Sequence, residues 1–145
     1  EFTPAFGRME TISTDGKIIK ILLSKNPTGF NESIRTALAA GATNFLFVLN
    51  DRIPDGRDVS WIWDVDFEVL HDQQMITVSG DRCYDMGLRL KYAGLEMKKV
   101  IIEPDLEKAV EQAVESVKTS ETVWILPTYS AMLDVRKILI GRKIL

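Results

Sequence analysis

The residues best suited to chemistry lie in one segment, residues 50–66, with the sequence NDRIPDGRDVSWIWDVD. This segment contains five aspartates, two arginines and two tryptophans. A loop that only faces solvent needs neither the tryptophans nor so many carboxylates. We therefore predict a site at which Asp and Arg side chains face a polar ligand or a partner protein, while Trp61 and Trp63 pack beneath or against it. The alternative is a structural loop whose Asp–Arg pairs and turns only fix its shape.

Metal and thiol chemistry find little support in the sequence. Counting from Asp51, positions three and twelve of a calcium loop are Ile53 and Ile62, so the required oxygen ligands are missing. One or two carboxylates could hold Mg²⁺, but nothing in the spacing supports it. The single cysteine, Cys83, and the single histidine, His71, are too few for a zinc site. We predict no metal site, a buried and inert Cys83 and a surface His71, and we expect this chain not to hold a whole Cys–His or Ser–His active site.

A second candidate is the loop Lys25-Asn26-Pro27-Thr28-Gly29, between a predicted strand and a predicted helix. Backbone N–H groups at a helix start can bind an anion, and Lys25 adds positive charge. A plain turn with a helix N-cap is the alternative. The chain has neither G-x-x-x-x-G-K-[S/T] nor G-x-G-x-x-G, so we predict that it has no phosphate-binding loop of its own.

The elements that must position these loops alternate along the chain. The predicted strands are residues 17–23, 44–49, 75–78, 100–102 and 123–126. The first predicted helix begins near residue 31, and the later ones are 82–93, 105–118 and 130–138. Such alternation predicts an α/β, Rossmann-like fold with a mainly parallel sheet and helices on both faces. Because ligands bind beyond the carboxyl ends of such strands, the loops expected at the site are 24–29, 50–60, 79–82, 103–105 and 127–129.

The overall composition is that of one globular domain. The chain has 145 residues, of which 46 % are hydrophobic and 27 % charged, with a net charge of −3. This balance argues against a broad surface for nucleic acid or for an anionic membrane. No apolar run approaches the length of a membrane span, the N-terminus lacks a signal-peptide pattern, and a single cysteine fits a reducing cytoplasm. Residues 1–4 read as a linker and residues 5–145 as the domain.

Several stretches taken together resemble one family. They are AFGR at residues 5–8, SKNPTGFN at 24–31, LND at 49–51, DGRDVSWIWD at 55–64, SG at 79–80 with Arg82, RLKYAG at 89–94 and LPTYSAML at 126–133. This set resembles the C-terminal domain of the MurT subunit of lipid II isoglutaminyl synthase, a relative of the Mur ligases, and D-G-R-D-x-S-W is its most specific part. The resemblance implies a fold of the Mur ligase C-terminal domain type. It also implies an ATP-binding central domain upstream, which this chain lacks.

The resemblance further implies an activity that two subunits share. In this family, MurT uses ATP and Mg²⁺ to activate the α-carboxyl of the D-glutamate in the lipid II stem peptide. A glutaminase partner, GatD, hydrolyses glutamine, and the ammonia converts the activated carboxyl to the amide of D-isoglutamine. The isolated domain is expected to be inactive and to bind no cofactor. Its expected partners are GatD and, through the full-length enzyme, lipid II.

The family's functional residues carry over onto positions of this chain. Asp58 is the last aspartate of the D-G-R-D motif, so the resemblance makes it the third member of a glutaminase triad whose Cys and His belong to GatD. The residues expected to face substrate and nucleotide are Lys25, Asn26, Asn50 and Asp51. Those expected to support the site or contact the partner are Asp55, Arg57, Trp61 and Trp63. Two other classes stay open: a non-catalytic module that docks the glutaminase, and a stand-alone α/β domain that binds a small ligand.

Overall fold

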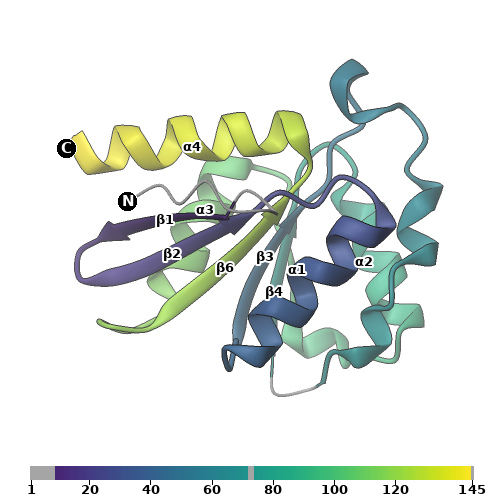
Figure 1. Cartoon of the computed structure of the whole chain (residues 1–145), viewed down its shortest axis with the longest axis horizontal. Coiled ribbons are helices and arrows are strands. Elements are labelled where there is room, and N and C mark those ends of the chain that lie inside the picture. The colour runs from purple at the N-terminus through teal and green to yellow at the C-terminus, as the bar shows by residue number, and fades with distance from the viewer. Residues whose placement is uncertain (1–8, 72–73, 145) are drawn as a thin grey trace.

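The computed structural model describes residues 9–71 and 74–144, within which six strands form one sheet in the order β1-β2-β6-β3-β4-β5 (Figure 1). β1 pairs antiparallel with β2, and every other neighbouring pair is parallel. The predicted linker at residues 1–4 and the AFGR stretch lie outside the described residues. The strands are β1 Met9–Thr14, β2 Lys17–Leu22, β3 Asn44–Val48, β4 Met75–Ser79, β5 Val100–Ile102 and β6 Thr122–Pro127.

Both faces of this sheet are covered by helices. α1 (Pro27–Ala39) and α2 (Cys83–Tyr92) pack on one face, and α3 (Leu106–Glu115) and α4 (Tyr129–Ile144) pack on the other (Figure 1). The prediction of an α/β, Rossmann-like fold with a mainly parallel sheet is therefore confirmed. In the described part of the chain, no helix combines the length and the apolar character that crossing a membrane requires.

β3 explains why the core has two halves. Its Phe45 and Phe47 face the cluster formed with α1 and α2, whereas Leu46 and Val48 face the cluster formed with α3 and α4. Each of these four side chains is essentially inaccessible to solvent. Successive side chains of a strand point to opposite faces, so a strand covered on both faces needs an unbroken apolar run. The run NFLFVL at residues 44–49 meets that requirement.

Three boundaries differ from the sequence prediction. β1 was not predicted; it forms a hairpin with β2 through Asp15 and Gly16, both of which have positive φ, as a tight two-residue turn requires. α1 begins at Pro27 rather than near residue 31, because Asn26 caps it and proline is well suited to the first helical position. α4 continues to Ile144, so the tail after residue 138, left unassigned from sequence, is helical almost to its end.

The segment after β3 leaves the carboxyl end of the sheet and runs alongside α2 (Figure 1). It forms three short 3₁₀ turns, Ile53–Asp55, Ser60–Asp64 and Phe67–Val69, before the chain enters β4. β3, β4 and β6 are adjacent and parallel, so the loops that follow them start at the same edge of the sheet. This edge is where the predicted functional loops converge.

Candidate functional site

Asn50 joins the three loops at the carboxyl edge of the sheet. Its backbone N–H donates to Thr128 Oγ1 at 3.1 Å, and its Nδ2 donates to Ser130 Oγ at 3.0 Å. Its Oδ1 accepts a hydrogen bond from the backbone N–H of Asp81 at 2.9 Å. The residue is 2 % exposed. Asn50 therefore holds the β3, β4 and β6 loops in one arrangement, and a contact of this residue with a substrate stays a prediction.

Gly80 lets these loops approach closely. Its φ is +98°, and a Cβ at this position would lie 2.5 Å from the carbonyl oxygen of Leu49 and 2.8 Å from Asn50 Oδ1. Both contacts are shorter than any side chain tolerates, and this backbone conformation itself disfavours L-residues. The close packing of the β4 loop on the β3 loop thus depends on glycine.

Asp55 links the segment after β3 to the start of α4. Its Oδ1 accepts from the backbone N–H of Ser130 at 2.8 Å, and its Oδ2 lies 2.5 Å from Ser130 Oγ. The Oδ2 atom also accepts from the backbone N–H of Arg52 at 3.1 Å. A carboxylate at a helix N-terminus satisfies free N–H groups and interacts favourably with the helix dipole. Asp55 therefore caps the start of α4 and ties it to the segment after β3.

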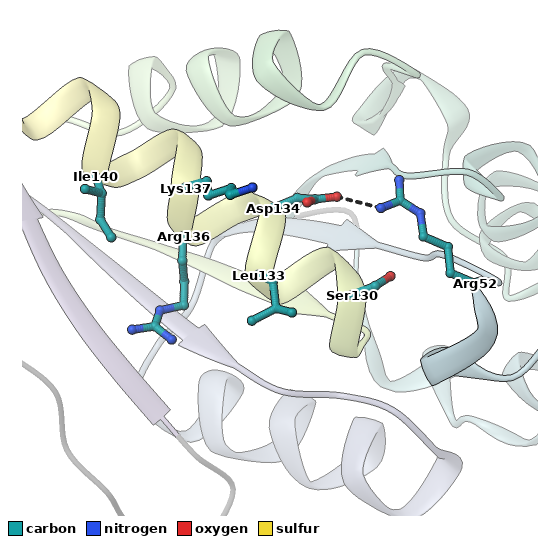
Figure 2. Close-up of a pocket in the computed structure, with 7 residues that line it drawn as sticks. All are labelled: Arg52, Ser130, Leu133, Asp134, Arg136, Lys137 and Ile140. Carbon is teal, nitrogen blue, oxygen red and sulfur yellow. Dashed lines mark hydrogen bonds and ion pairs between the residues drawn. The ribbon is translucent and has the colours of Figure 1, made fainter.

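Arg52 crosses the edge between the β4 loop and α4. Its Nε lies 3.0 Å from Asp81 Oδ2, and its Nη1 lies 2.9 Å from Asp134 Oδ2. The hydrogen bond that the guanidinium donates to Asp81 is the main cause that raises its pKa, and Asp134 adds to it. Figure 2 shows Arg52 at one end of a groove of about 470 Å³ along α4, whose lining also includes Ser130, Leu133, Asp134, Arg136, Lys137 and Ile140.

Asp51 is paired on the other side of the same loop. Its Oδ2 lies 3.0 Å from Nη1 of Arg82, whose Nε also lies 2.7 Å from Asp85 Oδ2. These two carboxylates raise the pKa of the Arg82 guanidinium, Asp85 more than Asp51. Asp51 therefore stands at the carboxyl edge as predicted for a loop facing a ligand, with its charge balanced by Arg82.

Asp58 follows this network along the same segment, near enough to Arg82 for its charge to act on the Asp58 carboxyl. Its side chain is exposed, and its Oδ1 accepts from the backbone N–H of Ser60 at 2.8 Å. This backbone hydrogen bond lowers the pKa of the Asp58 carboxyl, and the Ser60 hydroxyl and the charge of Arg82 lower it further. Asp58 is thus an ionised carboxylate, oriented by a local turn and accessible from outside the molecule.

The remaining residues singled out in this segment fall into two groups. Trp61 is partly buried against the core and lies 6.1 Å from the ring of Phe30. Arg57 is exposed, and Trp63 keeps 47 % of its surface accessible. The two tryptophans, which the sequence analysis treated together, therefore differ. Trp61 packs on the core beneath the loop, and Trp63 lies on the surface.

Arg89 of α2 is a residue that the sequence pattern did not single out as part of the site. It is 3 % exposed, its Nε donates to the carbonyl of Ile62 at 3.1 Å, and its Nη2 donates to the carbonyl of Val65 at 2.6 Å. The guanidinium also forms two hydrogen bonds with Glu68, which lower the pKa of that carboxyl. The central carbon of the Arg89 guanidinium, Cζ, lies 5.3 Å from the ring centroid of Trp63. Arg89 thereby holds the second half of the segment onto α2.

The signal for Arg89 was present in the helix periodicity. Met86, Arg89 and Leu90 lie three and four residues apart, so the arginine falls on the buried stripe of α2. A charged side chain at such a position must find several partners, because burying an unpaired charge is very costly. Here the partners include the carbonyls of Ile62 and Val65, each of which also accepts one backbone N–H, from Val65 and Phe67 respectively.

The loop with Lys25 and Asn26 lies beside the carboxyl end of β6, where the backbone N–H of Ser24 donates to the Pro127 carbonyl at 2.9 Å. Asn26 Oδ1 accepts from the Gly29 N–H at 2.8 Å and caps α1, and Lys25 is exposed. The N-cap reading is confirmed for Asn26. Anion binding at this loop stays a prediction.

Cys83 and His71 lie where the sequence predicts them, one buried and one on the surface. Cys83 is buried, and burial is the main cause that raises the pKa of its thiol, so it is poorly suited to act as a nucleophile. His71 is exposed. Within residues 9–71 and 74–144, no group of three or more His, Cys, Asp or Glu side chains is placed to hold a metal ion.

Comparison with known proteins gives consistent matches. The family model described as MurT ligase C-terminal matches residues 23–132. A Staphylococcus aureus protein named lipid II isoglutaminyl synthase (glutamine-hydrolyzing) subunit MurT is 39 % identical over 117 residues, which cover 79 % of this chain and 26 % of that protein. Its Streptococcus pneumoniae counterpart is 34 % identical over 142 residues, covering 96 % of this chain and 31 % of that protein. The chain thus spans less than a third of the length of these relatives.

Solved structures share the fold at low sequence identity. MurF from Acinetobacter baumannii superposes with a TM-score of 0.62 at 14 % identity, covering 96 % of this chain and 31 % of that chain. A UDP-N-acetylmuramoyl-L-alanyl-D-glutamate–2,6-diaminopimelate ligase gives 0.60 at 15 % identity, with 95 % and 32 % covered. MurF from Thermotoga maritima, solved in complex with ADP, gives 0.57 at 18 % identity, with 94 % and 30 % covered.

Proposed function

Because the chain belongs to the family of MurT ligase C-terminal domains, we propose that it is the C-terminal domain of the ATP-dependent subunit of a glutamine-hydrolysing lipid II isoglutaminyl synthase. The full-length enzyme amidates the D-glutamate of the lipid II stem peptide to D-isoglutamine. It works in the cytoplasm, where ATP and glutamine are available. The names of the relatives, which include lipid II, glutamine hydrolysis and a MurT subunit, support this proposal.

On the ligase side, the carboxyl edge of the sheet closes over the ATP site of the preceding domain. One structural neighbour, MurF from Thermotoga maritima, was solved with ADP, which supports nucleotide use in this fold group. ATP and Mg²⁺ bind in the upstream part of the full-length enzyme. The edge of this domain suits a covering role, because Asp51, Asp55 and Asp81 are each engaged with an arginine or with the start of α4.

On the glutaminase side, Asp58 completes a catalytic triad whose cysteine and histidine belong to a GatD-like partner. The carboxylate accepts a hydrogen bond from the imidazole N–H that faces away from the cysteine, which fixes the tautomer of the histidine and stabilises the imidazolium. The observation that carries this role is that Asp58 is an exposed, ionised carboxylate on a segment held to α2 by the buried Arg89. A surface carboxylate in a defined position can serve a group from another protein.

The test uses the full-length MurT subunit bound to its glutaminase, with Asp58→Asn as the variant. The amide keeps the shape of the side chain but removes its charge, so glutamine hydrolysis should fall by a factor on the order of 10²–10⁴. Amidation of lipid II with ammonium chloride in place of glutamine should continue, because the ligase site is separate. Asp64→Asn changes another exposed carboxylate of the same segment and is the matched control. Unchanged glutamine hydrolysis in Asp58→Asn would refute the triad role.

A second function, docking of the glutaminase without chemistry, is favoured by the exposed Trp63 and Arg57. Under this alternative, Asp58→Asn weakens assembly of the two subunits as much as it lowers glutamine hydrolysis. Measuring the dissociation constant of the complex beside the rate separates the two proposals. An unchanged dissociation constant with a large loss of rate supports the triad role alone.

A further inference from the structure

The outward face of α2 carries apolar side chains where a surface helix normally carries polar ones. Tyr84 is 66 % exposed, Leu88 48 % and Tyr92 69 %. Their spacing of four residues places them on one stripe, opposite the buried stripe that contains Met86. Exposed apolar side chains are common singly, but a contiguous group of them marks an interaction surface.

Trp63 extends this stripe beyond the helix. Its ring centroid lies 5.7 Å from that of Tyr92, and 47 % of its surface is exposed. We call Tyr84, Leu88, Tyr92 and Trp63 together the α2 stripe. Tyrosine and tryptophan are the residue types most enriched among those that dominate binding energy at protein interfaces.

The stripe is preorganised for binding. Three of its members stand on a regular helix, and Trp63 is held by the buried guanidinium of Arg89 beneath it. Arg89 is itself fixed by the carbonyls of Ile62 and Val65. Side chains already held in place lose little conformational entropy on binding, which favours affinity.

The α2 stripe is continuous with the surface that displays Asp58. Asp58 precedes the 3₁₀ turn that carries Trp63, and the charge of Arg82, the residue before α2, acts on its carboxyl. A protein that brings a histidine to Asp58 therefore lies close to the turn of Trp63 and to the start of α2. The groove along α4, by contrast, lies across the sheet from α2 (Figures 1 and 2).

We propose that the α2 stripe is the docking surface for the glutaminase subunit, which buries these four side chains and thereby places its histidine at Asp58. This proposal rests on the proposed function, because it takes the partner to be the subunit that uses Asp58. The remainder of the MurT polypeptide is the other large body that could cover the stripe. The ligase role proposed above instead brings that part to the carboxyl edge, at the loops of Asn50 and Thr128.

The test measures binding of the full-length MurT subunit to its glutaminase by biolayer interferometry. Leu88→Asp places a charge in the middle of the stripe, and Tyr92→Ala removes an aromatic ring at its end. Each should raise the dissociation constant by about tenfold or more, as expected for central interface positions. Leu133→Asp is the matched control, because Leu133 is 44 % exposed on α4, close to the 48 % of Leu88, but lies on the opposite face.

The enzymatic readout separates this proposal from the triad role. Glutamine hydrolysis by Leu88→Asp should return to the wild-type plateau when the glutaminase is in large excess, whereas Asp58→Asn should bind normally and stay inactive at every concentration. If Asp58→Asn is fully active while Leu88→Asp binds weakly, the triad role fails and the docking surface stands. Circular dichroism melts confirm that each variant is folded.

Four results would overturn the docking proposal. Leu88→Asp and Tyr92→Ala could bind the glutaminase as tightly as the wild type, or Leu133→Asp could be the variant that weakens binding. Leu88→Asp could lower ammonium-dependent amidation without changing the dissociation constant, which would assign the stripe to the remainder of the same polypeptide. It could also convert a self-associated MurT subunit to a monomer without affecting the partner, which would assign the stripe to a second copy.

Discussion

Replacement of Arg89 by methionine is the most informative stability test of the segment that carries Asp58. Methionine matches much of the arginine stem in length and is apolar, so the core beneath the segment stays filled. What disappears is the guanidinium that donates to the Ile62 carbonyl at 3.1 Å and to the Val65 carbonyl at 2.6 Å. Its ion pair with Glu68 disappears as well.

The expected loss can be built from these contacts. The carbonyls of Ile62 and Val65 each keep a backbone donor, from Val65 and Phe67 respectively, so what is lost is two hydrogen bonds from a charged donor, each contributing about 1.5–3 kcal/mol. The side chain of Glu68 is 53 % exposed, so it becomes hydrated again and contributes less than about 1 kcal/mol. We therefore expect Arg89→Met to lower the free energy of unfolding by about 3–5 kcal/mol. For a chain near 150 residues, this corresponds to a fall in melting temperature of about 10–15 °C.

The assay is urea unfolding of this chain, followed by tryptophan fluorescence and by circular dichroism. Glu68→Gln and Arg57→Met are the controls: the first removes only the ion pair with Arg89, and the second removes an exposed arginine of the same segment. Both should cost less than about 1 kcal/mol. If Arg89→Met cost no more than Glu68→Gln, the carbonyl contacts would not be what holds the segment, and the reasoning would be wrong.

Two further predictions concern the same region. Gly80→Ala should destabilise the chain by about 3 kcal/mol or more, because its Cβ would meet the Leu49 carbonyl at 2.5 Å. The control Gly41→Ala has a similar φ of +81° but no atom within 4 Å of the new Cβ, so it should cost only about 1–2 kcal/mol, and equal losses in the two urea titrations would contradict the clash. Arg89 lowers the pKa of Glu68 below its ordinary value of 4.5, so the stability from this pair is present above pH 4.5 and is lost as the pH falls through the folded-state pKa. Urea titrations between pH 3 and pH 6 should show a shallower loss in Glu68→Gln, and identical slopes would argue against the pair.

The alternation of apolar runs predicted the central architecture because it reflects local periodicity. The run at residues 44–49 has no polar residue after Asn44, and only a strand covered on both faces suits such a run. Helix patterns with periods near 3.6 residues separated the strands, and βαβ connections have few allowed topologies. The fold class therefore followed from the order of the elements alone.

β1 was not predicted because its own sequence carries a weak strand pattern and its pairing with β2 is what makes it a strand. The sequence METIST mixes polar and apolar residues, and five of its six positions are intermediate or exposed. It becomes a strand because the Asp15-Gly16 turn returns it alongside β2, where its backbone groups find partners. An edge strand that packs weakly leaves little mark on the hydrophobic pattern.

Residue types alone were enough to locate the segment 50–66 as the unusual part of this chain, and the resemblance to the family singled out Asp58 within its D-G-R-D motif. They could not divide the roles among Asn50, Arg89 and the two tryptophans. Asn50 is a buried link because it forms hydrogen bonds with Thr128 and Ser130, which lie 78 and 80 positions further along the chain. Arg89 is one because it donates to the carbonyls of Ile62 and Val65, which lie 27 and 24 positions earlier. Trp61 and Trp63 are two residues apart, yet one packs on the core and the other lies on the surface. Whether a side chain is buried depends on which elements, distant in the sequence, pack against it. The tertiary structure alone therefore decided which of these side chains hold the segment in place and which are available to a partner.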